Sequence, residues 1–353
     1  MDTLLSPRRR ALIQALGATA ILAGCGEVPG LARRPLAAFR GPAMGTVWNA
    51  KLAGSLAEGL APKAESLVAS ALERVVSRMS TYLETSELSR FNRQPAKEPL
   101  AVSPETIEVF ALAREVSEAT GGAFDATVAP AVDAWGFGPS KATRIPGAAE
   151  LAALGPRIDW RAIAVDREAG TLAKSREGIR ADLSAIAKGY GVDLAARALE
   201  AAGARDYLVE AGGEVRVRGR NADGEPWRIG IEEPDAMPPR PWLVVPLDGL
   251  AMATSGDYRI YFEQGGRRYS HEIDPATREP VRGSLASVTV VARDCAWADA
   301  MATALFVMGA DRGMAFATER GMAACFIERG EGGKLVDRQS PAFAKLGATR
   351  AVA

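Results

Sequence analysis

The sequence has few of the residues that usually hold transition metals. Its 353 residues include three cysteines and one histidine. No two cysteines form a C-x-x-C pair, and a single histidine cannot build a multi-histidine site, which argues against zinc and iron–sulfur centres. Cys295 and Cys325 could form a disulfide in an oxidising compartment, but their spacing does not require one. The chain also lacks the GxxxxGK(S/T) and GxGxxG motifs, so neither common nucleotide-binding fold is indicated.

The sequence has no excess of positive charge either. Its 43 Lys and Arg residues balance 43 Asp and Glu residues. Removal of residues 1–24 would take away three arginines and one aspartate and leave a slightly acidic protein. Nucleic-acid-binding proteins usually carry a basic surplus, so the composition argues against that class. After the N-terminal segment, no apolar run is long enough to span a bilayer.

The N-terminus has the layout of an export signal. Arginines at residues 8–10 precede a mostly apolar run over residues 11–23, which is too short for a mature transmembrane helix. Residues 22–25 read LAGC, which looks like a lipobox, where bacteria lipidate the cysteine and cleave before it. An ordinary secretory signal is the alternative, and the sequence RRALI at residues 9–13 leaves both Sec and Tat export open.

This N-terminus divides the chain into three parts. Residues 1–24 are predicted to be a lipoprotein signal peptide, and Cys25 is predicted to carry the lipid. Residues 25–38 include two prolines and two arginines and are typical of a flexible tether. Residues 39–348 are predicted to form one catalytic body on the periplasmic side of a bacterial membrane.

Hydrophobic spacing predicts helices mixed with strands. Apolar residues recur at helical spacing over residues 61–79, 104–120, 186–202 and 298–308. Strands are predicted over residues 47–52, 207–210, 215–218, 242–246 and 286–291. Residues 259–262 and 268–271 flank two glycines, which indicates a hairpin. Since strands and helices do not alternate regularly, we predict an α+β fold with mixed or antiparallel sheets and packed helices.

Two glycine- or helix-associated segments are candidates for ligand binding. Gly121 and Gly122 precede Ala123, Phe124 and Asp125, so the backbone could approach a ligand there, although a plain helix end followed by a turn is the alternative. Residues 182–190 read DLSAIAKGY at the predicted start of a helix. A helix N-terminus with a nearby lysine suits an anion, but the acidic residue could also be a plain N-cap.

Two further groups are candidates for catalysis and metal binding. His271, the only histidine, lies close to Asp274 at the end of the predicted hairpin and is either a structural residue or part of a site. Asp299 and Thr303 are four residues apart and share one face of a helix. A carboxylate with a hydroxyl suits Mg²⁺, while an N-cap aspartate with a back-bonded threonine is the alternative.

These motifs occur together and in order, and in this respect the chain resembles the ApbE family of FAD:protein FMN transferases. The matching segments are residues 44–46, 79–82, 86–92, 122–128, 135–137, 182–190, 212–213, 255–258, 271–275 and 298–303. They cover nearly the whole predicted body. The resemblance implies an ApbE-like, T-fold-like catalytic body and, for the lipid anchor, the inner membrane.

The resemblance also implies a role for individual residues. The FAD site would be lined by Met44, Tyr82, Ala123, Phe124, Asp125, Asp182, Lys188 and Ile273. The backbone carbonyl of Ala185, with Asp299 and Thr303, would hold Mg²⁺ near the pyrophosphate. A threonine hydroxyl of an acceptor flavoprotein, of the redox-pump or periplasmic-reductase type, would attack the FMN-side phosphorus, and AMP would leave. For the base that takes the hydroxyl proton, His271 is the first candidate, and Asp257 and Asp274 are alternatives.

The chain departs from the family pattern at three positions, and two rival functions stay open. Arg278 stands where a glycine is usual, which would reshape that turn, and Glu272 stands where an apolar residue is more usual. Ala302 replaces a second metal-side aspartate of some members. With water in place of the acceptor hydroxyl, the site would be a Mg²⁺-dependent FAD pyrophosphatase. A periplasmic lipoprotein that only binds FAD is the non-enzyme alternative.

Replacement of Cys25 by serine tests the predicted anchor. Serine has no thiol for lipid attachment, so we expect Cys25→Ser protein not to be processed as a lipoprotein. Mass spectrometry of the mature N-terminus would check this in the wild type and the variant. Membrane-bound mature protein with an unmodified Cys25 would contradict the assignment.

Overall fold

The computed structural model describes residues 34–139 and 143–351. The predicted signal peptide and Cys25 lie outside the described residues. The first strand, β1 (Leu36–Ala43), pairs with β2 (Thr46–Ala53), so the last residues of the predicted tether belong to the folded body. At the other end, β18 (Thr349–Arg350) extends the body slightly beyond residue 348.

A central sheet of eight strands organises the protein, and its neighbouring strands are antiparallel. The strand order is β1-β2-β6-β7-β10-β15-β16-β17. The remaining strands of this sheet are β6 (Tyr207–Ala211), β7 (Glu214–Arg218), β10 (Ala251–Gly256), β15 (Leu285–Ala292), β16 (Ala323–Arg329) and β17 (Leu335–Gln339). Along β10, Ala251 and Ala253 join the core on one face while Met252 joins the core on the other. Both faces are therefore covered, as a buried sheet requires.

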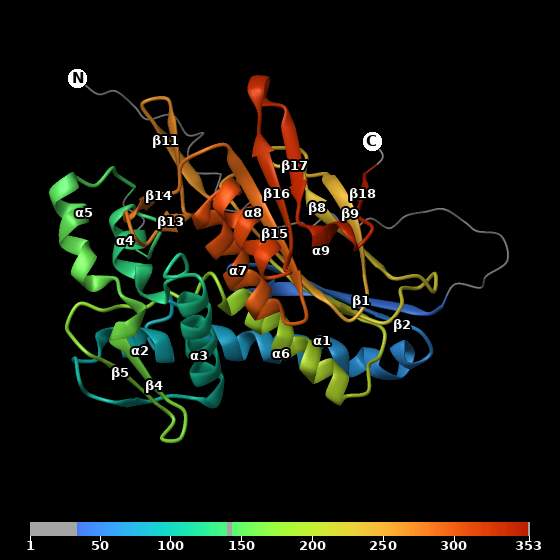
Figure 1. Ribbon diagram of the computed structural model, residues 1–353. Helices are drawn as coiled ribbons and strands as arrows, with labels where there is room; N and C mark the ends of the chain where they lie inside the picture. The colour runs from blue at the N-terminus through green and yellow to red at the C-terminus, as the bar shows by residue number, and fades with distance from the viewer. Residues whose placement is uncertain (1–33, 140–142, 352–353) are drawn as a thin grey trace, which may run out of the picture.

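Helices cover one face of the central sheet, and a small sheet covers the other. The covering helices are α1 (Leu56–Met79), α6 (Ala187–Ala201) and α7 (Cys295–Met308) (Figure 1). On the opposite face, β8 (Trp227–Glu232) and β9 (Pro241–Leu247) form a three-stranded sheet with β18, which shares a hydrophobic core with the central sheet. Two further helices, α8 (Ala310–Glu319) and α9 (Pro341–Ala344), precede β16 and follow β17, respectively.

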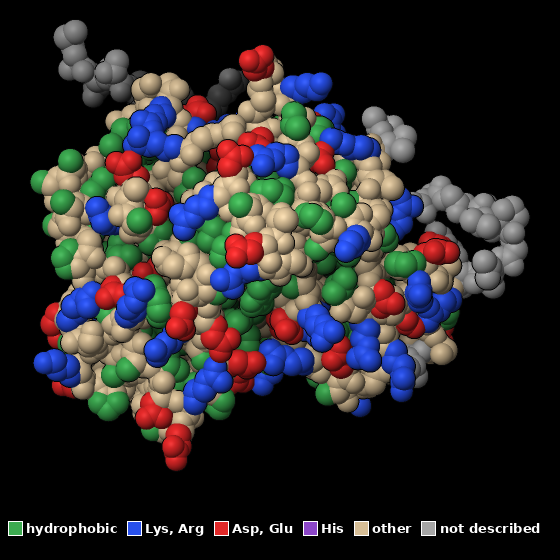
Figure 2. Space-filling model, in the orientation of Figure 1, with side chains coloured by type: hydrophobic (Ala, Val, Ile, Leu, Met, Phe, Trp, Pro, Cys, Tyr) green, Lys and Arg blue, Asp and Glu red, His purple; other side chains and the backbone are tan. Residues whose placement is uncertain are grey.

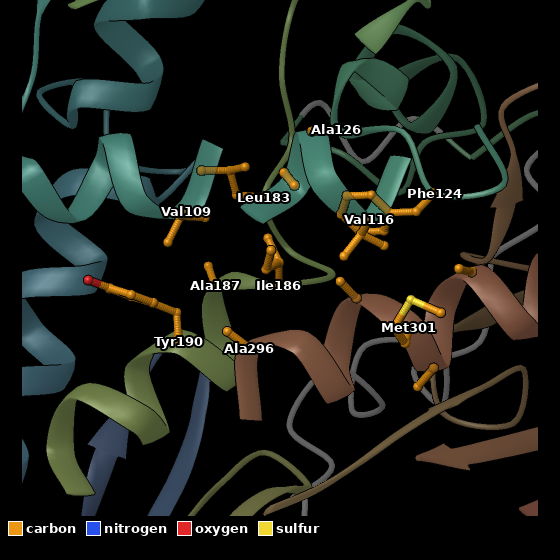
Figure 3. Packing of buried hydrophobic residues seen from close by; sticks show 14 of the residues in the cluster. Val109, Val116, Phe124, Ala126, Leu183, Ile186, Ala187, Tyr190, Ala296 and Met301 are labelled. Carbon is orange, nitrogen blue, oxygen red and sulfur yellow. The ribbon is translucent and has the colours of Figure 1, made fainter. Parts of the chain in front are cut away.

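A second, mainly helical part is fused to this sandwich. It contains α2 (Glu87–Arg93), α3 (Pro104–Ala119), α4 (Ala129–Ala134), α5 (Ala148–Leu154) and a sheet of β3 (Leu100–Ala101), β4 (Ile163–Asp166) and β5 (Thr171–Lys174). Figure 3 shows Val109 and Val116 of α3 converging with Ile186, which precedes α6, and with Met301 of α7. One hydrophobic core thus joins both parts, in keeping with a single catalytic body.

Short strands between β10 and β15 complete the fold. The hairpin of β11 (Tyr261–Gln264) and β12 (Arg267–Ser270) is followed by β13 (Ile273–Asp274), which pairs with β14 (Glu279–Pro280). Figure 1 shows these strands beside α4 and α5. Tyr269 stacks on Phe262 at 5.1 Å and on Trp135 at 5.4 Å between ring centroids, so aromatic packing fixes the hairpin to the helical part.

The distribution of surface charge and the length of the helices both bear on what the protein can bind. In the view of Figure 2, positive and negative side chains are interspersed, without a broad patch of one sign. Within residues 34–139 and 143–351, no helix combines the length and apolarity needed to cross a membrane.

The structure confirms the α+β class and most of the predicted elements, with shifted ends. The helix predicted from residue 104 is α3, opened by the side chain of Ser103, and Gly265 and Gly266 form the hairpin loop with positive φ angles of 61° and 73°. The helix predicted from residue 298 begins at Cys295, with Asp294 as the N-cap residue. The alternative that Asp299 is a plain N-cap is therefore wrong. Cys295 and Cys325 are buried free thiols, so the optional disulfide does not form.

Helices α6 and α7 are joined by two reciprocal contacts at their N-terminal ends. Asp299 of α7 accepts a hydrogen bond from the amide of Gly189 in α6 at 3.0 Å. Asp193 of α6 accepts from the amides of Cys295 and Ala296 in α7 at 3.0 and 2.9 Å. Each carboxylate satisfies amides at the start of the other helix, where the helix dipole also favours negative charge.

The Gly189→Ala substitution tests this crossing. A Cβ atom at Gly189 would lie 2.4 Å from the carbonyl oxygen of Cys295, so the helices would have to move apart. We expect Gly189→Ala to lower the free energy of unfolding by about 1–3 kcal/mol or more, as overpacking does. Gly59→Ala is the control, because Gly59 lies within α1 and nothing would touch its Cβ. That control should raise the stability by about 0.5–1 kcal/mol in the same urea titration.

Candidate active site

The contact between α6 and α7 gathers charged side chains at one place. Lys188, in the first turn of α6, forms an ion pair with Glu214 at the start of β7. Glu214 is 1% exposed, while 32% of the Lys188 side chain remains accessible. Burial alone would lower the pKa of Lys188, but Glu214 and Asp299 outweigh burial and raise that pKa. Lys188 therefore stays cationic and can still reach an anionic ligand.

Oxygen atoms that suit Mg²⁺ lie around Asp299. Burial raises the pKa of Asp299, which means that the charged carboxylate is unfavourable there. A cation beside the carboxylate would stabilise its charged form. Thr303, one turn along α7, does not simply bond back along its helix but shares a hydrogen bond of 2.8 Å with Ser255 of β10. Gly189 is the third residue of α6, so its amide has no partner within the helix and donates to Asp299 instead. Ala185 lies two residues before this helix.

These donors fit a hard cation. Among the residues that the structure describes, no three His, Cys, Asp or Glu side chains are grouped so as to hold a metal ion. A metal at Asp299 would therefore rest on one carboxylate and neutral oxygens, with water and phosphate oxygens as further ligands, which is the usual arrangement for Mg²⁺.

His271 and Glu272 lie directly after the hairpin, within the electrostatic reach of Lys188. The Nδ1 atom of His271 is 3.2 Å from the carbonyl oxygen of Ile260, and its Nε2 atom is 3.5 Å from Oε1 of Glu272. Burial lowers the pKa of His271 below its usual value, although 34% of its side chain remains accessible. At neutral pH the imidazole is therefore uncharged and able to accept a proton.

The two alternative bases are occupied by other contacts. Asp257 forms a bidentate ion pair with Arg329, with distances of 2.7 and 2.9 Å. Asp274 accepts hydrogen bonds from the amide of Ala276 at 2.8 Å and from the hydroxyl of Thr277 at 3.2 Å, which makes it the cap of a tight turn.

Two loops that carry predicted FAD residues are tied together by their backbones. Asp125 accepts hydrogen bonds from the amide and hydroxyl of Thr127 at 2.7 and 2.6 Å and from the amide of Trp160. The amide of Asp182 donates to the carbonyl of Ala126 at 2.7 Å. The Asp182 side chain accepts from Ser184 and is not the N-cap of α6, because that helix begins later, at Ala187.

The remaining predicted FAD residues differ in exposure. Tyr82 is 63% exposed, and partial burial together with Asp182 and Asp133 raises its pKa, which places it beside the Asp182 loop. Met44, in the turn between β1 and β2, has a φ of 54° and packs against Gly191 of α6. Ala123, Phe124 and Ile273 are buried, so a ligand there would meet mainly their backbone. Phe124 and Ile273 belong to hydrophobic clusters, and Figure 3 shows Phe124 in its cluster.

Sequence reasoning missed three residues that shape the site. The family resemblance assigned no role to these residues, although they lie inside or beside its matching segments: Asn92, Glu214 and Ser255. The Asn92 side chain exchanges two hydrogen bonds with the backbone of Ala181, at 2.7 and 2.8 Å, and so fixes the segment that leads into Asp182. Strand alternation could have indicated Glu214, since its neighbour Val215 faces the second sheet and Glu214 must face the helices.

Arg278 occupies its turn in a conformation that favours glycine. It has a φ of 63°, the left-handed conformation that glycine would adopt. Its amide donates to the carbonyl of Asp274 and its carbonyl accepts from Nε1 of Trp135, both at 2.7 Å. These two contacts hold the backbone in place despite the side chain.

Comparisons with known proteins agree with this geometry. The sequence profile of the ApbE family matches residues 44–326. The FAD:protein FMN transferase of Haemophilus influenzae is 40% identical over 317 residues, covering 88% of this chain and 91% of that protein. The FAD:protein FMN transferase of Vibrio cholerae is 42% identical over 309 residues, covering 87% of this chain and 90% of that protein. The solved flavin transferase ApbE from Vibrio cholerae has a TM-score of 0.81 at 39% identity and covers 89% of this chain and 99% of its own, which confirms the ApbE-like body. The chain therefore belongs to the ApbE family.

Proposed function

We propose that this protein is a FAD:protein FMN transferase that depends on Mg²⁺. It transfers FMN from FAD to a threonine hydroxyl of an acceptor flavoprotein and releases AMP. The observation that carries the proposal is the convergence of a cation, a buried carboxylate and an imidazole, namely Lys188, Asp299 and His271. The names of the relatives in Haemophilus influenzae and Vibrio cholerae support flavin transfer as the reaction.

Each of these residues has a defined task in the reaction. The bond between the FMN-side phosphorus and the bridging oxygen breaks while the threonine oxygen bonds to that phosphorus. Lys188 would bind negative charge on the pyrophosphate, and Asp299, Thr303 and the Ala185 carbonyl would hold Mg²⁺, which would neutralise further charge. A proton on Nδ1 of His271 would donate to Ile260, which leaves a lone pair on Nε2 for the hydroxyl proton.

The same proposal includes a location and a class of partner. The LAGC sequence at residues 22–25 supports lipid attachment at Cys25 on the periplasmic side, most simply in the inner membrane. Acceptors would then be flavoprotein subunits of the redox-pump or periplasmic-reductase type.

One assay separates transfer from its two rivals. The protein is incubated with FAD, Mg²⁺ and a candidate acceptor domain, and AMP and acceptor-bound flavin fluorescence are measured. Transfer gives both products, a FAD pyrophosphatase gives AMP and free FMN, and a protein that only binds FAD gives neither. A threonine-to-valine acceptor domain is the control, since it has no hydroxyl to attack.

The Asp299→Asn variant tests the metal assignment. Asparagine keeps an oxygen for the Gly189 amide but removes the charge, whereas alanine would also leave that amide unpaired at a cost of about 1–3 kcal/mol. We expect Asp299→Asn to lose the Mg²⁺-dependent rise in melting temperature and about 10²-fold or more in rate. Thr303→Val should lose less, because it removes a neutral ligand. Wild-type turnover of Asp299→Asn at limiting Mg²⁺ would show that the metal lies elsewhere.

The His271→Ala variant tests the base. Proton abstraction belongs to the transition state, so we expect a rate loss of about 10²–10⁴-fold with little change in FAD affinity. Single-turnover transfer and titration of FAD by flavin fluorescence would give the two quantities. If affinity falls by as much as the rate, His271 serves FAD binding and not proton transfer.

A further inference from the structure

Glu272 is a buried carboxylic acid for which the reaction described above has no use. Its residue is 6% exposed, and its backbone carbonyl is fixed by the amide of Val281 at 2.7 Å. Its Oε1 atom lies 3.5 Å from Nε2 of His271, the nitrogen that would take the hydroxyl proton. A small rotation of either side chain would bring the two atoms within hydrogen-bonding distance.

Charged groups from four elements face Glu272. They are Lys188 from α6, Asp299 from α7, Asp257 after β10 and His271 from its own segment. Burial raises the pKa of Glu272 to about 8, Asp299 and Asp257 raise it as well, and Lys188 and the Gly256 amide oppose the shift. The pKa of the neighbouring imidazole is shifted the other way, below its usual value. A proton shared by this pair therefore rests on the carboxyl group and not on the ring.

We propose that Glu272 receives, through the imidazole of His271, the proton that the acceptor hydroxyl releases. This rests on the proposed transfer reaction. The hydroxyl proton moves to Nε2 of His271 as the threonine oxygen bonds to phosphorus, and AMP leaves with the electron pair of the broken P–O bond. The Nε2–H group then turns from the threonine oxygen toward Glu272, the same proton passes to Oε1, and it leaves to solvent after the product departs. Glu272 acts through His271 and does not itself touch the flavin.

The dependence of the transfer rate on pH distinguishes this relay from His271 acting alone. If the imidazole were the only titrating group, its pKa would lie below the usual histidine value of about 6.5. The rate would then already be constant above pH 6.5. A carboxylate with a raised pKa must lose its proton before it can accept another, so the relay predicts a rate that still rises between pH 6.5 and 8.5.

The test is single-turnover transfer from pH 5.5 to 9 with the full chain, FAD, Mg²⁺ and the acceptor domain of the assay above. We expect Glu272→Gln to lose the rise above pH 6.5 and to be about 10- to 100-fold slower at pH 8, with FAD affinity within twofold of wild type. Glu272→Asp keeps a carboxyl group and should recover part of the rise. A Glu272→Gln variant that keeps the wild-type profile overturns the proposal.

Glu214→Gln is the matched control. Glu214 is also a buried glutamate whose pKa burial raises, but its partner is Lys188 and not His271. Glu214→Gln removes the charge that faces Lys188 and should retain the rise above pH 6.5. If Glu214→Gln loses the rise of the transfer rate above pH 6.5 while Glu272→Gln keeps it, Glu214 is the titrating group and the relay is overturned.

Thermal unfolding checks the premise independently of activity. Because the folded state raises the pKa of Glu272, the contribution of Glu272 to stability is lost as pH rises from about 4.5 through about 8. Glu272→Gln has no such proton to lose. The melting temperature of the variant minus that of the wild type should therefore increase between pH 6 and 8.5. An unchanged difference would mean that Glu272 does not titrate in this range. Absence of transfer by the wild type would instead refute the proposed function, whatever the variants do.

Discussion

The reciprocal contact between α6 and α7 is the constraint on which the site depends. Asp193 satisfies the first amides of α7, and Asp299 satisfies an amide in the first turn of α6. Gly189 permits the close approach, since any larger residue would meet the backbone of Cys295. Once the two helices cross there, Lys188 and Asp299 must lie side by side at the end of the central sheet. Lys188 and Asp299 are thus placed by helix packing.

The crossing also creates an electrostatic problem that a ligand would solve. Glu214, Glu272 and Asp299 are all buried near one lysine, and burial raises the pKa of each carboxyl group. Full ionisation of three carboxylates against Lys188 would leave an excess of negative charge in a poorly solvated place. A divalent cation would restore the balance and would allow a pyrophosphate to bind. The proposed role of Mg²⁺ is therefore supported by the charge of the protein side chains as well as by the charge of FAD.

Local patterns in the sequence predicted much of this protein. Helical spacing identified α3, and two glycines at 265 and 266 identified the hairpin that precedes His271. The four-residue spacing of Asp299 and Thr303 predicted that both lie on one helix, and both belong to α7. These predictions succeeded because a helix period or a two-residue turn is decided by neighbours in the chain. Helix ends were less accurate. Because α7 starts at Cys295, Asp299 lies inside the helix and contacts α6, which excludes the alternative that it is an N-cap.

The sequence by itself determined the α+β class, the order of the motifs and the kinds of side chain available for chemistry. Only the tertiary structure decided which side chains meet. Lys188 meets a glutamate 26 residues away, and Gly189 meets Asp299 110 residues away, because strands return the chain to the same end of the sheet. The tertiary structure also pairs Asp257 with Arg329 and places Glu272 beside His271. Such pairings depend on sheet order and helix crossing, which no local spacing encodes.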